Sequence, residues 1–440
     1  MGKASPQARV TLQLALDCVD LERALRVARL AVPKGVDWVE AGTPLIKSEG
    51  LDAVRALREA FPGKKIVADM KTVDAGRIEM EAAAKAGADY AIVLGTASES
   101  TIREAIEVGN SYGLRIGVDL LGVGEPEELA ARLGEWGVAF LGVHCPIDIQ
   151  MTGGAEASEF ALLERLAKAT AVPLAAAGGL NSETAPQAAA AGASIVVIGG
   201  AITKAEDPAK ATEDIRRALD SGKAIKTELF RRAGPEDVRE VLTRVSTANI
   251  SHGSHHRPCL AGLAQITPGA KLVGPVLTVR TAPGDFAKPV EAIDRAEPGQ
   301  VIAIDAGGVP PAVWGELASE SAVQRGLAGV VVDGGIRDTD EIRTLGFPAH
   351  AKVVCSHAGH PKGFGEIGAP VRLCGVEVRP GDWLVGDADG VMLLPKEKVV
   401  EMANRAQDIL ELENRQRAEI REGRTLGEVA FLERWEKRRG

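Results

Sequence analysis

Short apolar runs alternate with amphipathic stretches through the first half of the chain. Each run ends in polar residues or glycine, and a segment rich in Ala, Leu, Glu and Arg follows, such as LERALRVARLA or LDAVRALREAF. Runs of this length are typical of strands that are buried on both faces of a parallel sheet. The runs cover residues 11–17, 36–42, 65–71, 90–95, 115–122, 139–145, 173–179 and 195–200.

Eight strand–helix pairs within roughly 210 residues predict a closed (β/α)8 barrel, which we place at residues 1–222. A doubly wound open sheet is the alternative arrangement of such pairs. The first run is not followed by the GxGxxG turn that is typical of the dinucleotide-binding form of that sheet. The pattern therefore favours the barrel.

The alternation of apolar runs and amphipathic stretches ends after residue 220. The polar stretch SGKAIKTELFRRAGPEDV is broken at Gly234-Pro235 and predicts a linker at residues 223–235. Short apolar runs and PG turns in 236–400 predict a compact, β-rich α/β domain. Residues 401–440 form a charged segment with apolar positions at helical spacing, which indicates a long helix that packs on its own domain or contacts another subunit.

Composition indicates a soluble cytoplasmic protein. Of the 440 residues, 45% are hydrophobic and 26% are charged, and no apolar run approaches the ~18 residues that a membrane span requires. The N-terminal MGKASPQARV has no apolar signal core, and the five cysteines lie far apart without a CxxC pair, which is typical of reduced thiols. A net charge of -9 argues against a nucleic-acid surface.

The candidate chemistry lies at the predicted strand ends, because active sites of (β/α)8 barrels are built at the carboxyl ends of the strands. Asp69 and Lys71 are two positions apart in one strand, so we expect both side chains on the same face, with Asp74 just beyond. A solvated loop or an internal salt bridge would account for one such pair of charged residues. Neither accounts for polar or charged residues at all of these strand ends together. The strand ends supply Asp17, Glu40, Asp69, Lys71, Asp74, Asp119 and His144, followed by the glycine pairs Gly178-Gly179 and Gly199-Gly200.

These residue types suit chemistry on a sugar phosphate. Carboxylates that a single lysine cannot neutralise form a site for a hard cation such as Mg2+, which would polarise sugar oxygens. Lys71 adds a second positive charge beside a developing anion, and His144 can transfer a proton near neutral pH. The glycine pairs close the seventh and eighth strands, where backbone N–H groups often bind phosphate.

The segments LQLALD, VEAGTPLIKSEG, ADMKTVDAG, AGADYAIVLGTA and AAGGL resemble 3-hexulose-6-phosphate synthases of the orotidine-monophosphate-decarboxylase superfamily. The resemblance covers nearly all of residues 10–220, and its DxKxxD signature is specific. It implies condensation of formaldehyde with ribulose 5-phosphate, with Mg2+ stabilising an enediolate, to give hexulose 6-phosphate. The direction in which the reaction runs in the cell stays open.

The resemblance also implies roles for the candidate residues. Glu40 and Asp69 are similar to the metal ligands, and Asp17 and Lys71 to the groups that orient substrate and stabilise charge. His144 is similar to the proton-transfer residue. Asp74 matches the aspartate that reaches into a neighbouring subunit, which implies a dimer. Gly178, Gly179, Gly199 and Gly200 match the phosphate-binding loops.

A related decarboxylase of 3-keto-L-gulonate 6-phosphate shares most of this site and remains an alternative. The segments GTPLIKSEG and DMKTVDAG are more similar to the synthases. The chain departs from them after His144, where Cys145-Pro146 replaces small residues, whereas Asp148 and Gln150 still fit.

A second candidate site lies in the predicted β-rich domain. Arg337-Asp338 follows a predicted strand, with Glu341 three positions later. Arginine suits a bidentate grip on a carboxylate and aspartate suits a divalent ion, although a turn with a surface ion pair is the simpler interpretation. Together with Glu316 and the segments GPVLTV, IAIDAGG and VGDADGVMLLP, the pattern resembles the RraA-like family over residues 236–400.

That family includes aldolases of 4-hydroxy-4-methyl-2-oxoglutarate, which also decarboxylate oxaloacetate, and the regulator of ribonuclease activity A, which binds protein. The resemblance implies that Arg337 holds a carboxylate, that Asp338 positions a second divalent ion, and that Gly307-Gly308 offers backbone donors. Glu316 stands where the aldolases tend to have glycine, so both activities stay open.

Two further expectations concern metal and assembly. His252, His255 and His256 in ISHGSHHRPC are either a transition-metal site or part of an exposed loop. Because the synthase family is dimeric and the RraA-like family trimeric, the resemblances imply a homo-oligomer, with a hexamer satisfying both.

Overall fold

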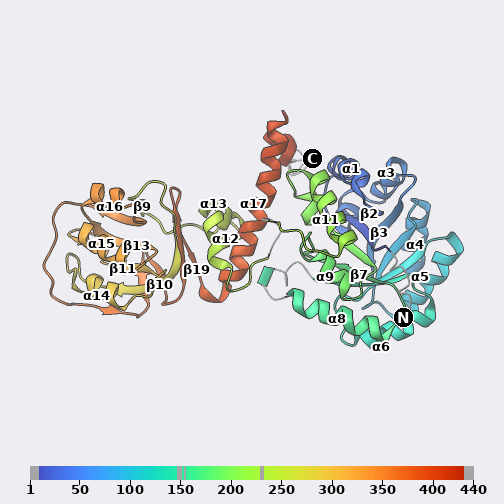
Figure 1. Ribbon diagram of the computed structural model, residues 1–440, viewed down its shortest axis with the longest axis horizontal. Helices are drawn as coiled ribbons and strands as arrows, with labels where there is room; N and C mark the ends of the chain where they lie inside the picture. Colours follow the sequence, from blue (N-terminus) through green and yellow to red (C-terminus); the bar gives the residue numbers. More distant parts are fainter. Residues whose placement is uncertain (1–8, 146–150, 153–154, 228–231, 431–440) are drawn as a thin grey trace, which may run out of the picture. The chain divides into compact units, whose positions relative to one another are not determined.

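The computed structural model describes residues 9–145, 151–152, 155–227 and 232–430 (Figure 1). The chain divides into two compact units. The first holds residues up to 150, 154–232 and those from Glu411 onward, and the second holds 151–153 and Ala233–Leu410. The division therefore falls inside a single long helix, α17 (Val399–Arg421).

The first unit is a closed barrel of eight parallel strands, as the sequence predicts. Neighbouring strands pair in chain order, and β1 pairs with β8 to close the ring. The strands are β1 (Thr11–Leu16), β2 (Trp38–Ala41), β3 (Lys65–Thr72), β4 (Tyr90–Leu94), β5 (Arg115–Asp119), β6 (Phe140–His144), β7 (Leu174–Ala177) and β8 (Ile195–Ile198).

Helices surround this barrel and bury their apolar stripes against the outward faces of the strands. Local sequence starts several of them, because the side chains of Asp20, Ser98 and Asp207 each accept a hydrogen bond from a backbone N–H of the first helical turn. The helices are α1 (Leu21–Ala31), α2 (Thr43–Glu49), α3 (Asp52–Ala60), α4 (Gly76–Lys85), α5 (Glu99–Tyr112), α6 (Pro126–Trp136), α8 (Ala155–Ala169), α9 (Ala185–Ala190), α10 (Gly200–Thr203) and α11 (Pro208–Ser221), with a 3-10 turn at Val32–Lys34.

A separate apolar cluster fills the barrel interior. The rings of Trp38 and Tyr90 stack with centroids 4.4 Å apart, and Phe140 packs against both. Together with Ile92 and Ala175 these side chains form a solid plug rather than a pore. Polar chemistry is therefore confined to the end of the barrel above the plug, where the strands finish.

The second unit is built on a nine-stranded mixed sheet with the order β19-β18-β10-β11-β13-β14-β9, in which β12 pairs with β13 and β15 with β10. The central strands β10, β11, β13 and β14 are parallel, and β9, β15, β18 and β19 pair antiparallel. The strands are β9 (Ala264–Gln265), β10 (Leu272–Arg280), β11 (Val301–Asp305), β12 (Ala312–Trp314), β13 (Gly329–Ile336), β14 (Ala349–Val354), β15 (Glu366–Ile367), β18 (Trp383–Asp387) and β19 (Gly390–Leu394), beside a hairpin of β16 (Val371–Leu373) and β17 (Val376–Val378).

Helices cover this sheet, as predicted for an α/β domain with a C-terminal helix. The first turns of α17 pack with α12 and α13 on β18 and β19, in a cluster that includes Leu242, Ile250 and Met402. The helices are α12 (Val238–Arg244), α13 (Thr247–Gly253), α14 (Ala287–Arg295), α15 (Glu316–Gln324) and α16 (Thr339–Leu345), with a 3-10 turn at Lys396–Lys398 before α17 and with α18 (Leu426–Ala430) after it.

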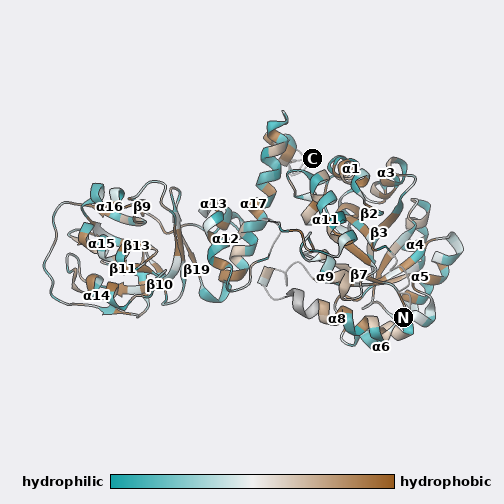
Figure 2. Cartoon of the chain, in the orientation of Figure 1, coloured by the Kyte–Doolittle hydropathy of each residue, from teal (hydrophilic) through white to brown (hydrophobic). Residues whose placement is uncertain are grey.

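Figure 2 shows apolar residues concentrated on the strands of each unit, with polar residues along the outer faces of the helices. Among the described helices, none combines the length and the apolar character that crossing a membrane demands.

Candidate active site at the carboxyl end of the barrel

Eight ionisable side chains line one cavity of about 470 Å³ at the carboxyl ends of the barrel strands. Ile92, Phe140 and Ala175 of the interior plug also line it. Six of the eight were singled out from the strand ends in the sequence, and the structure brings them together with Lys204 and Arg232. The six predicted residues are Asp17, Glu40, Asp69, Lys71, Asp119 and His144.

Lys71 is held between two carboxylates. Its Nζ lies 3.1 Å from Asp69 Oδ2 and 3.0 Å from Asp119 Oδ2. The sequence argument assumed a regular strand, but the β3–β4 register shifts between Ala68 and Thr72, and Lys71 has φ +46°. A local irregularity, rather than simple alternation, therefore aims the ammonium at Asp69. Burial acts to lower the pKa of Lys71, but the two carboxylates outweigh it and raise that pKa, so the side chain is a cation.

Asp119 also contacts His144. Asp119 Oδ2 lies 3.4 Å from His144 Nδ1, and Asp119 Oδ1 accepts a hydrogen bond from the Leu121 N–H at 2.9 Å. Burial acts to raise the pKa of Asp119, but the contact with His144 and the charge of Lys71 hold it below its ordinary value. Asp119 is therefore ionised near neutral pH and contacts both the cation and the imidazole.

Two polar side chains that the sequence argument missed hold the remaining carboxylates. Thr43 Oγ1 donates to Asp69 Oδ2 at 2.6 Å, and Gln13 Nε2 donates to Glu40 Oε2. Gln13 is 1% exposed inside the barrel. A glutamine within the apolar run TLQLALD was the available signal, because a buried amide requires a polar partner.

The cavity carries a surplus of negative charge. Burial, followed by the charges of Asp69 and Asp17, raises the pKa of Glu40 well above its ordinary value. Burial and the charge of Asp69 likewise raise the pKa of Asp17. Four carboxylates line the cavity against the cations of Lys71, Lys204 and Arg232, so a bound cation would be stabilised beside the carboxylates.

The donor set fits Mg2+ bound mainly through substrate and water oxygens. Within the described ranges, no cluster of three or more His, Cys, Asp or Glu side chains is arranged to hold a metal by itself. Mg2+ usually takes only one or two protein carboxylates and keeps several waters or substrate oxygens. Glu40 and Asp69, the predicted ligands, match that requirement.

Both glycine pairs line the same cavity. Gly178 and Gly179 have φ values of +99° and +70°, and a Cβ built on Gly178 would lie 2.5 Å from the carbonyl oxygen of Cys145. The turn after β7 therefore requires glycine at that position. Gly199 and Gly200 follow β8, where Thr203 and Lys204 also line the cavity.

One predicted residue does not line the cavity, and others fall outside the described residues. Asp74 follows β3, is exposed and accepts a hydrogen bond from the Ala75 N–H at 2.7 Å, and it is not among the residues that line the cavity. Asp148 and Gln150 lie outside the described residues, as does Pro146.

Arg232 lines the cavity although the sequence argument placed it in a linker. Its side chain is 14% exposed and its Nη1 lies 3.7 Å from Glu411 Oε2, on the part of α17 that belongs to the first unit. The polar stretch FRRAG has no hydrophobic periodicity, so the sequence pattern did not predict that Arg232 lines the cavity.

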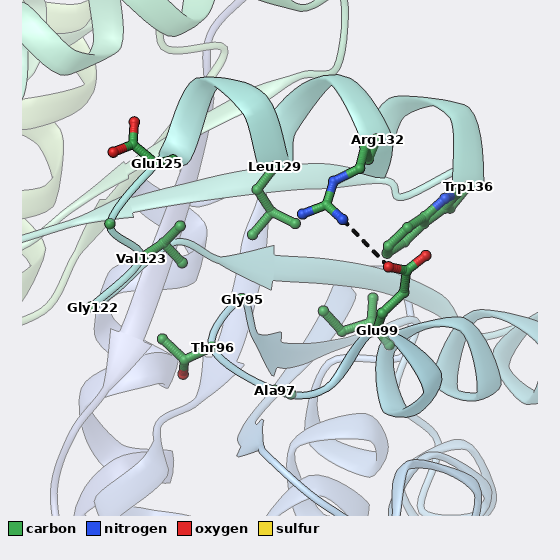
Figure 3. A pocket seen from close by; sticks show the side chains of 12 residues that line it. Gly95, Thr96, Ala97, Glu99, Gly122, Val123, Glu125, Leu129, Arg132 and Trp136 are labelled. Carbon is green, nitrogen blue, oxygen red and sulfur yellow. Dashed lines mark hydrogen bonds and ion pairs between the residues drawn. The ribbon is translucent and has the colours of Figure 1, made fainter.

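A second hollow, of about 350 Å³, lies between the loops that follow β4 and β5. Figure 3 shows Arg132 of α6 and Glu99 of α5 approaching each other across it, with Trp136 beside them. The Arg132 Nη1–Glu99 Oε2 distance is 3.3 Å. The eight ionisable residues of the larger cavity do not line this hollow.

In the second unit, the predicted residues lie at the carboxyl ends of β11 and β13. Arg337 Nε lies 3.2 Å from Asp338 Oδ2, and that same oxygen accepts a hydrogen bond from the Glu316 N–H at 3.2 Å. Glu341 is exposed on α16. Asp338 therefore joins Arg337 to the start of α15.

One expectation for the second unit concerns two backbone N–H groups and stays a prediction. Gly307 and Gly308 were expected to offer backbone donors. The Gly307 N–H donates to Asp305 Oδ1 at 3.2 Å, and the Gly308 N–H donates to the backbone oxygen of Asp333 at 3.0 Å. Both groups are thus already engaged within the domain.

The histidine cluster is partly assembled. The rings of His252 and His256 stack with centroids 5.1 Å apart, and His255 and His256 both have φ +58°. In the part of the chain that the structure describes, no group of three or more His, Cys, Asp or Glu could hold a metal ion, so the metal hypothesis for this cluster stays a prediction.

Comparison with known proteins identifies the barrel. The family model "Orotidine 5'-phosphate decarboxylase / HUMPS family" matches residues 11–215. The 3-hexulose-6-phosphate synthase of Mycobacterium gastri is 40% identical over 208 residues, which are 47% of this chain and 99% of that protein. The chain belongs to the 3-hexulose-6-phosphate synthase family.

Further members of the synthase family align in the same way. The synthase of Bacillus subtilis is 35% identical over 48% of this chain and 99% of its own length. A solved structure described as 3-hexulose-6-phosphate synthase is 39% identical over 47% of this chain and 99% of that chain, with a TM-score of 0.45. The identities to the two curated synthases show that the barrel, about half of the chain, is an enzyme domain.

The second unit is matched by a different model. The RraA-like family model, described as Aldolase/RraA, matches residues 243–393. The predicted fusion of a synthase barrel with an RraA-like domain is therefore confirmed. Arg232 and Glu411 lie outside the residues matched by either model.

Proposed function

We propose that the barrel catalyses the Mg2+-dependent aldol condensation of formaldehyde with D-ribulose 5-phosphate to D-arabino-hex-3-ulose 6-phosphate, and its reverse. The names of its relatives support this reaction. The observation that carries the proposal is the Lys71 ammonium, fixed between Asp69 and Asp119 in a cavity that His144 also lines.

The reaction begins with removal of a proton from C1 of ribulose 5-phosphate, which gives an enediolate. C1 then forms a bond to the carbon of formaldehyde, the carbonyl π bond breaks, and the resulting alkoxide takes up a proton to give the new hydroxyl group. Lys71 stabilises the negative charge that develops on the enediolate, because it is a cation in a largely buried site.

His144 is the residue that we assign to proton transfer. It lines the cavity, and the contact of its Nδ1 with Asp119 orients the ring. We propose that it accepts the proton from C1 and that an acid form returns a proton to the new alkoxide. Asp119 thereby links the proton-transfer group to the charge-stabilising Lys71.

Glu40 and Asp69 would hold Mg2+, which supplies polarisation of the substrate oxygens. The contacts from Gln13 and Thr43 fix the orientation of the two carboxylates. Asp17 would orient the substrate hydroxyls, and the glycine pairs after β7 and β8 would bind the phosphate group through backbone N–H groups.

The test is consumption of formaldehyde in the presence of ribulose 5-phosphate, with Mg2+ or with a chelator. The wild-type protein should require Mg2+, and Asp69→Asn should lose the activity. Asp52→Asn, on the exposed side of α3 with a side chain that is 79% exposed, is the matched control and should retain it. Mg2+-independent turnover would contradict the metal assignment.

An inactive wild-type protein would favour the related decarboxylase reaction. Release of CO2 from 3-keto-L-gulonate 6-phosphate by the same preparation would then identify the barrel's activity.

For the RraA-like domain we propose a 2-oxo-acid aldolase or decarboxylase site at Arg337 and Asp338, with a divalent ion near Asp338. The Arg337–Asp338 contact after β13 supports it. Decarboxylation of oxaloacetate that is lost in Arg337→Gln would bear this out. Without that activity, a protein partner whose binding survives Arg337→Gln would instead favour a regulatory module.

We propose a cytoplasmic homo-oligomer in which the barrels form dimers and the RraA-like domains trimers, giving a hexamer. The exposed position of Asp74 is compatible with a role across a subunit interface. Light scattering that gives a monomer would contradict this assembly.

A further inference from the structure

A cluster of charged side chains joins the barrel to the end of α17 within the first unit. Arg26 Nη1 of α1 lies 3.6 Å from Glu419 Oε2, and Arg415 Nε lies 3.7 Å from Glu419 Oε1. Glu411 is 0% exposed and faces Arg232 at 3.7 Å. The end of α17 thus contacts Arg232, a residue that lines the cavity.

This cluster reaches the cavity at two places. Arg232 lines the cavity itself, together with Thr203 and Lys204 of the segment after β8. Arg23 Nη2 donates to the backbone oxygen of Thr203 at 3.1 Å. The cluster therefore adjoins the part of the cavity where the second glycine pair lies.

Positive charge exceeds negative charge in the cluster. Arginine keeps its proton inside proteins, and buried charges require partners of opposite sign. Arg415 is 5% exposed, and its Nε and Nη1 have no hydrogen-bond partner among the residues that the structure describes. The cluster contains Arg23, Arg26, Arg232, Arg415 and Arg424 against Asp20, Glu411, Glu419 and Glu422.

We propose that Arg232, positioned by Glu411, binds the phosphate group of the sugar phosphate in the barrel cavity. A phosphate dianion matches both the surplus of positive charge and the bidentate geometry of a guanidinium group. Glu411 is a positioning residue, which holds the guanidinium at the cavity wall without touching substrate. The identity of the ligand rests on the proposed function, whereas the anion site rests on the cluster itself.

In this arrangement α17 supports the substrate site through Arg232 without lining it. Arg232 follows the last barrel helix and Glu411 follows the RraA-like domain, so both lie outside the residues that the two family models match. The fusion would therefore supply a phosphate contact from residues outside the synthase match.

Calorimetric titration with inorganic phosphate tests the anion site without turnover. Arg232→Gln should weaken phosphate binding by about 10- to 100-fold, as expected for the loss of a charged hydrogen-bond donor. Arg232→Lys should recover part of the affinity, and Glu411→Gln should weaken it less than Arg232→Gln. Arg417→Gln removes the arginine of an exposed pair with Glu413 on the same helix and should bind phosphate like the wild type.

Removing Arg232 alone would take an ion-pair partner from the buried Glu411 carboxylate, so the double variant Arg232→Gln/Glu411→Gln controls for stability. It should melt close to the wild type and still bind phosphate weakly. In the formaldehyde assay, Arg232→Gln should raise the KM for ribulose 5-phosphate by a similar factor and change kcat by less than about threefold, since the contact is the same in ground and transition states.

The outcomes separate the two proposals. Wild-type turnover together with wild-type phosphate affinity in the folded double variant would overturn the role of Arg232 and leave the proposed function standing. Phosphate binding that depends on Arg232, in a wild-type protein that does not consume formaldehyde, would support the anion site and overturn the proposed reaction. Equal losses of affinity in Arg232→Gln and Arg417→Gln would show a general charge effect and also overturn the site.

Discussion

The ammonium group of Lys71 lies 3.0 Å from the carboxylate of Asp119, which is 48 positions later in the sequence and two strands away in the barrel. The barrel brings the two together because β3, β4 and β5 pair in parallel and end at the same rim. Asp119 in turn contacts His144. One carboxylate thus fixes both the cation and the imidazole of the proposed reaction.

Replacement of Lys71 by methionine should abolish most of the synthase activity. The variant keeps the length of the side chain but removes the charge that stabilises the enediolate. We expect kcat to fall by about 10²–10³-fold, the range found when one electrostatic donor is removed from an active site. Initial rates at saturating ribulose 5-phosphate measure this fall.

Lys65→Met is the matched control for that variant. Lys65 lies at the start of β3, at the opposite end of the barrel, and its side chain is 56% exposed beside Asp89. It should keep kcat within about twofold of the wild type, because an exposed ion pair contributes little. A similar kcat in both variants would refute the role of Lys71.

Glu40→Gln should stabilise the metal-free protein. The pKa of Glu40 is raised by burial and by neighbouring carboxylates, so its contribution to stability is greatest when it is protonated and is lost as pH rises above 4.5. At pH 7.5 in EDTA we therefore expect the variant to melt about 3–6 °C higher than the wild type. Mg2+ should raise the melting temperature of the wild type and have little effect on the variant.

The advantage of Glu40→Gln should also shrink toward pH 4.5, where the wild-type carboxyl group is protonated. A variant that melts below the wild type at pH 7.5, and that still responds fully to Mg2+, would remove Glu40 from the metal site.

The barrel and its main site were predictable from the sequence because both depend on local patterns. Buried strands give continuous apolar runs, and a polar residue at the end of such a run lies at the rim of the barrel. Glu40 and Asp69 could be found in this way. The domain limits that we predicted, at residues 222, 235 and 400, stay predictions.

The rest depended on tertiary contacts that leave no local signal. Lys71 reaches Asp69 through a strand irregularity, which hydrophobic alternation does not reveal. Arg232 and Glu411 are 179 positions apart and meet only in the folded chain. The hydrogen bonds that engage Gly307 and Gly308 follow from a turn geometry that composition alone does not specify.

His350 should make the RraA-like domain less stable in mild acid. The residue is 0% exposed, and burial lowers its pKa below 6.5 although Nε2 contacts the backbone oxygen of Asp387. The unfolded chain therefore binds a proton before the folded chain does, and stability that is present above pH 6.5 is lost as pH falls toward the folded pKa.

Hydrogen exchange in β14, which contains His350, measures this loss. The free energy of opening should fall between pH 7.5 and pH 5.5 in the wild type, and it should fall less in His350→Gln, which has no titrating ring. The same slope in both proteins would assign the acid sensitivity to other groups.

Gly178→Ala should weaken both the fold and the synthase site. The position has φ +99°, and the added Cβ would lie 2.5 Å from the carbonyl oxygen of Cys145, so the turn after β7 must shift. We expect a loss of about 2–4 kcal/mol in the free energy of unfolding, and a higher KM for ribulose 5-phosphate because that turn lines the cavity.

Gly113→Ala separates backbone strain from steric contact. Gly113 ends α5 with φ +73°, and a Cβ there would meet nothing within 4 Å. Gly113→Ala should lower the free energy of unfolding by only about 1 kcal/mol, since the αL conformation alone disfavours alanine. It should leave the KM for ribulose 5-phosphate unchanged. Denaturant unfolding and initial rates on both variants measure the difference. Equal losses of stability would mean that the turn after β7 accommodates the methyl group, and an unchanged KM in Gly178→Ala would place the phosphate away from that turn.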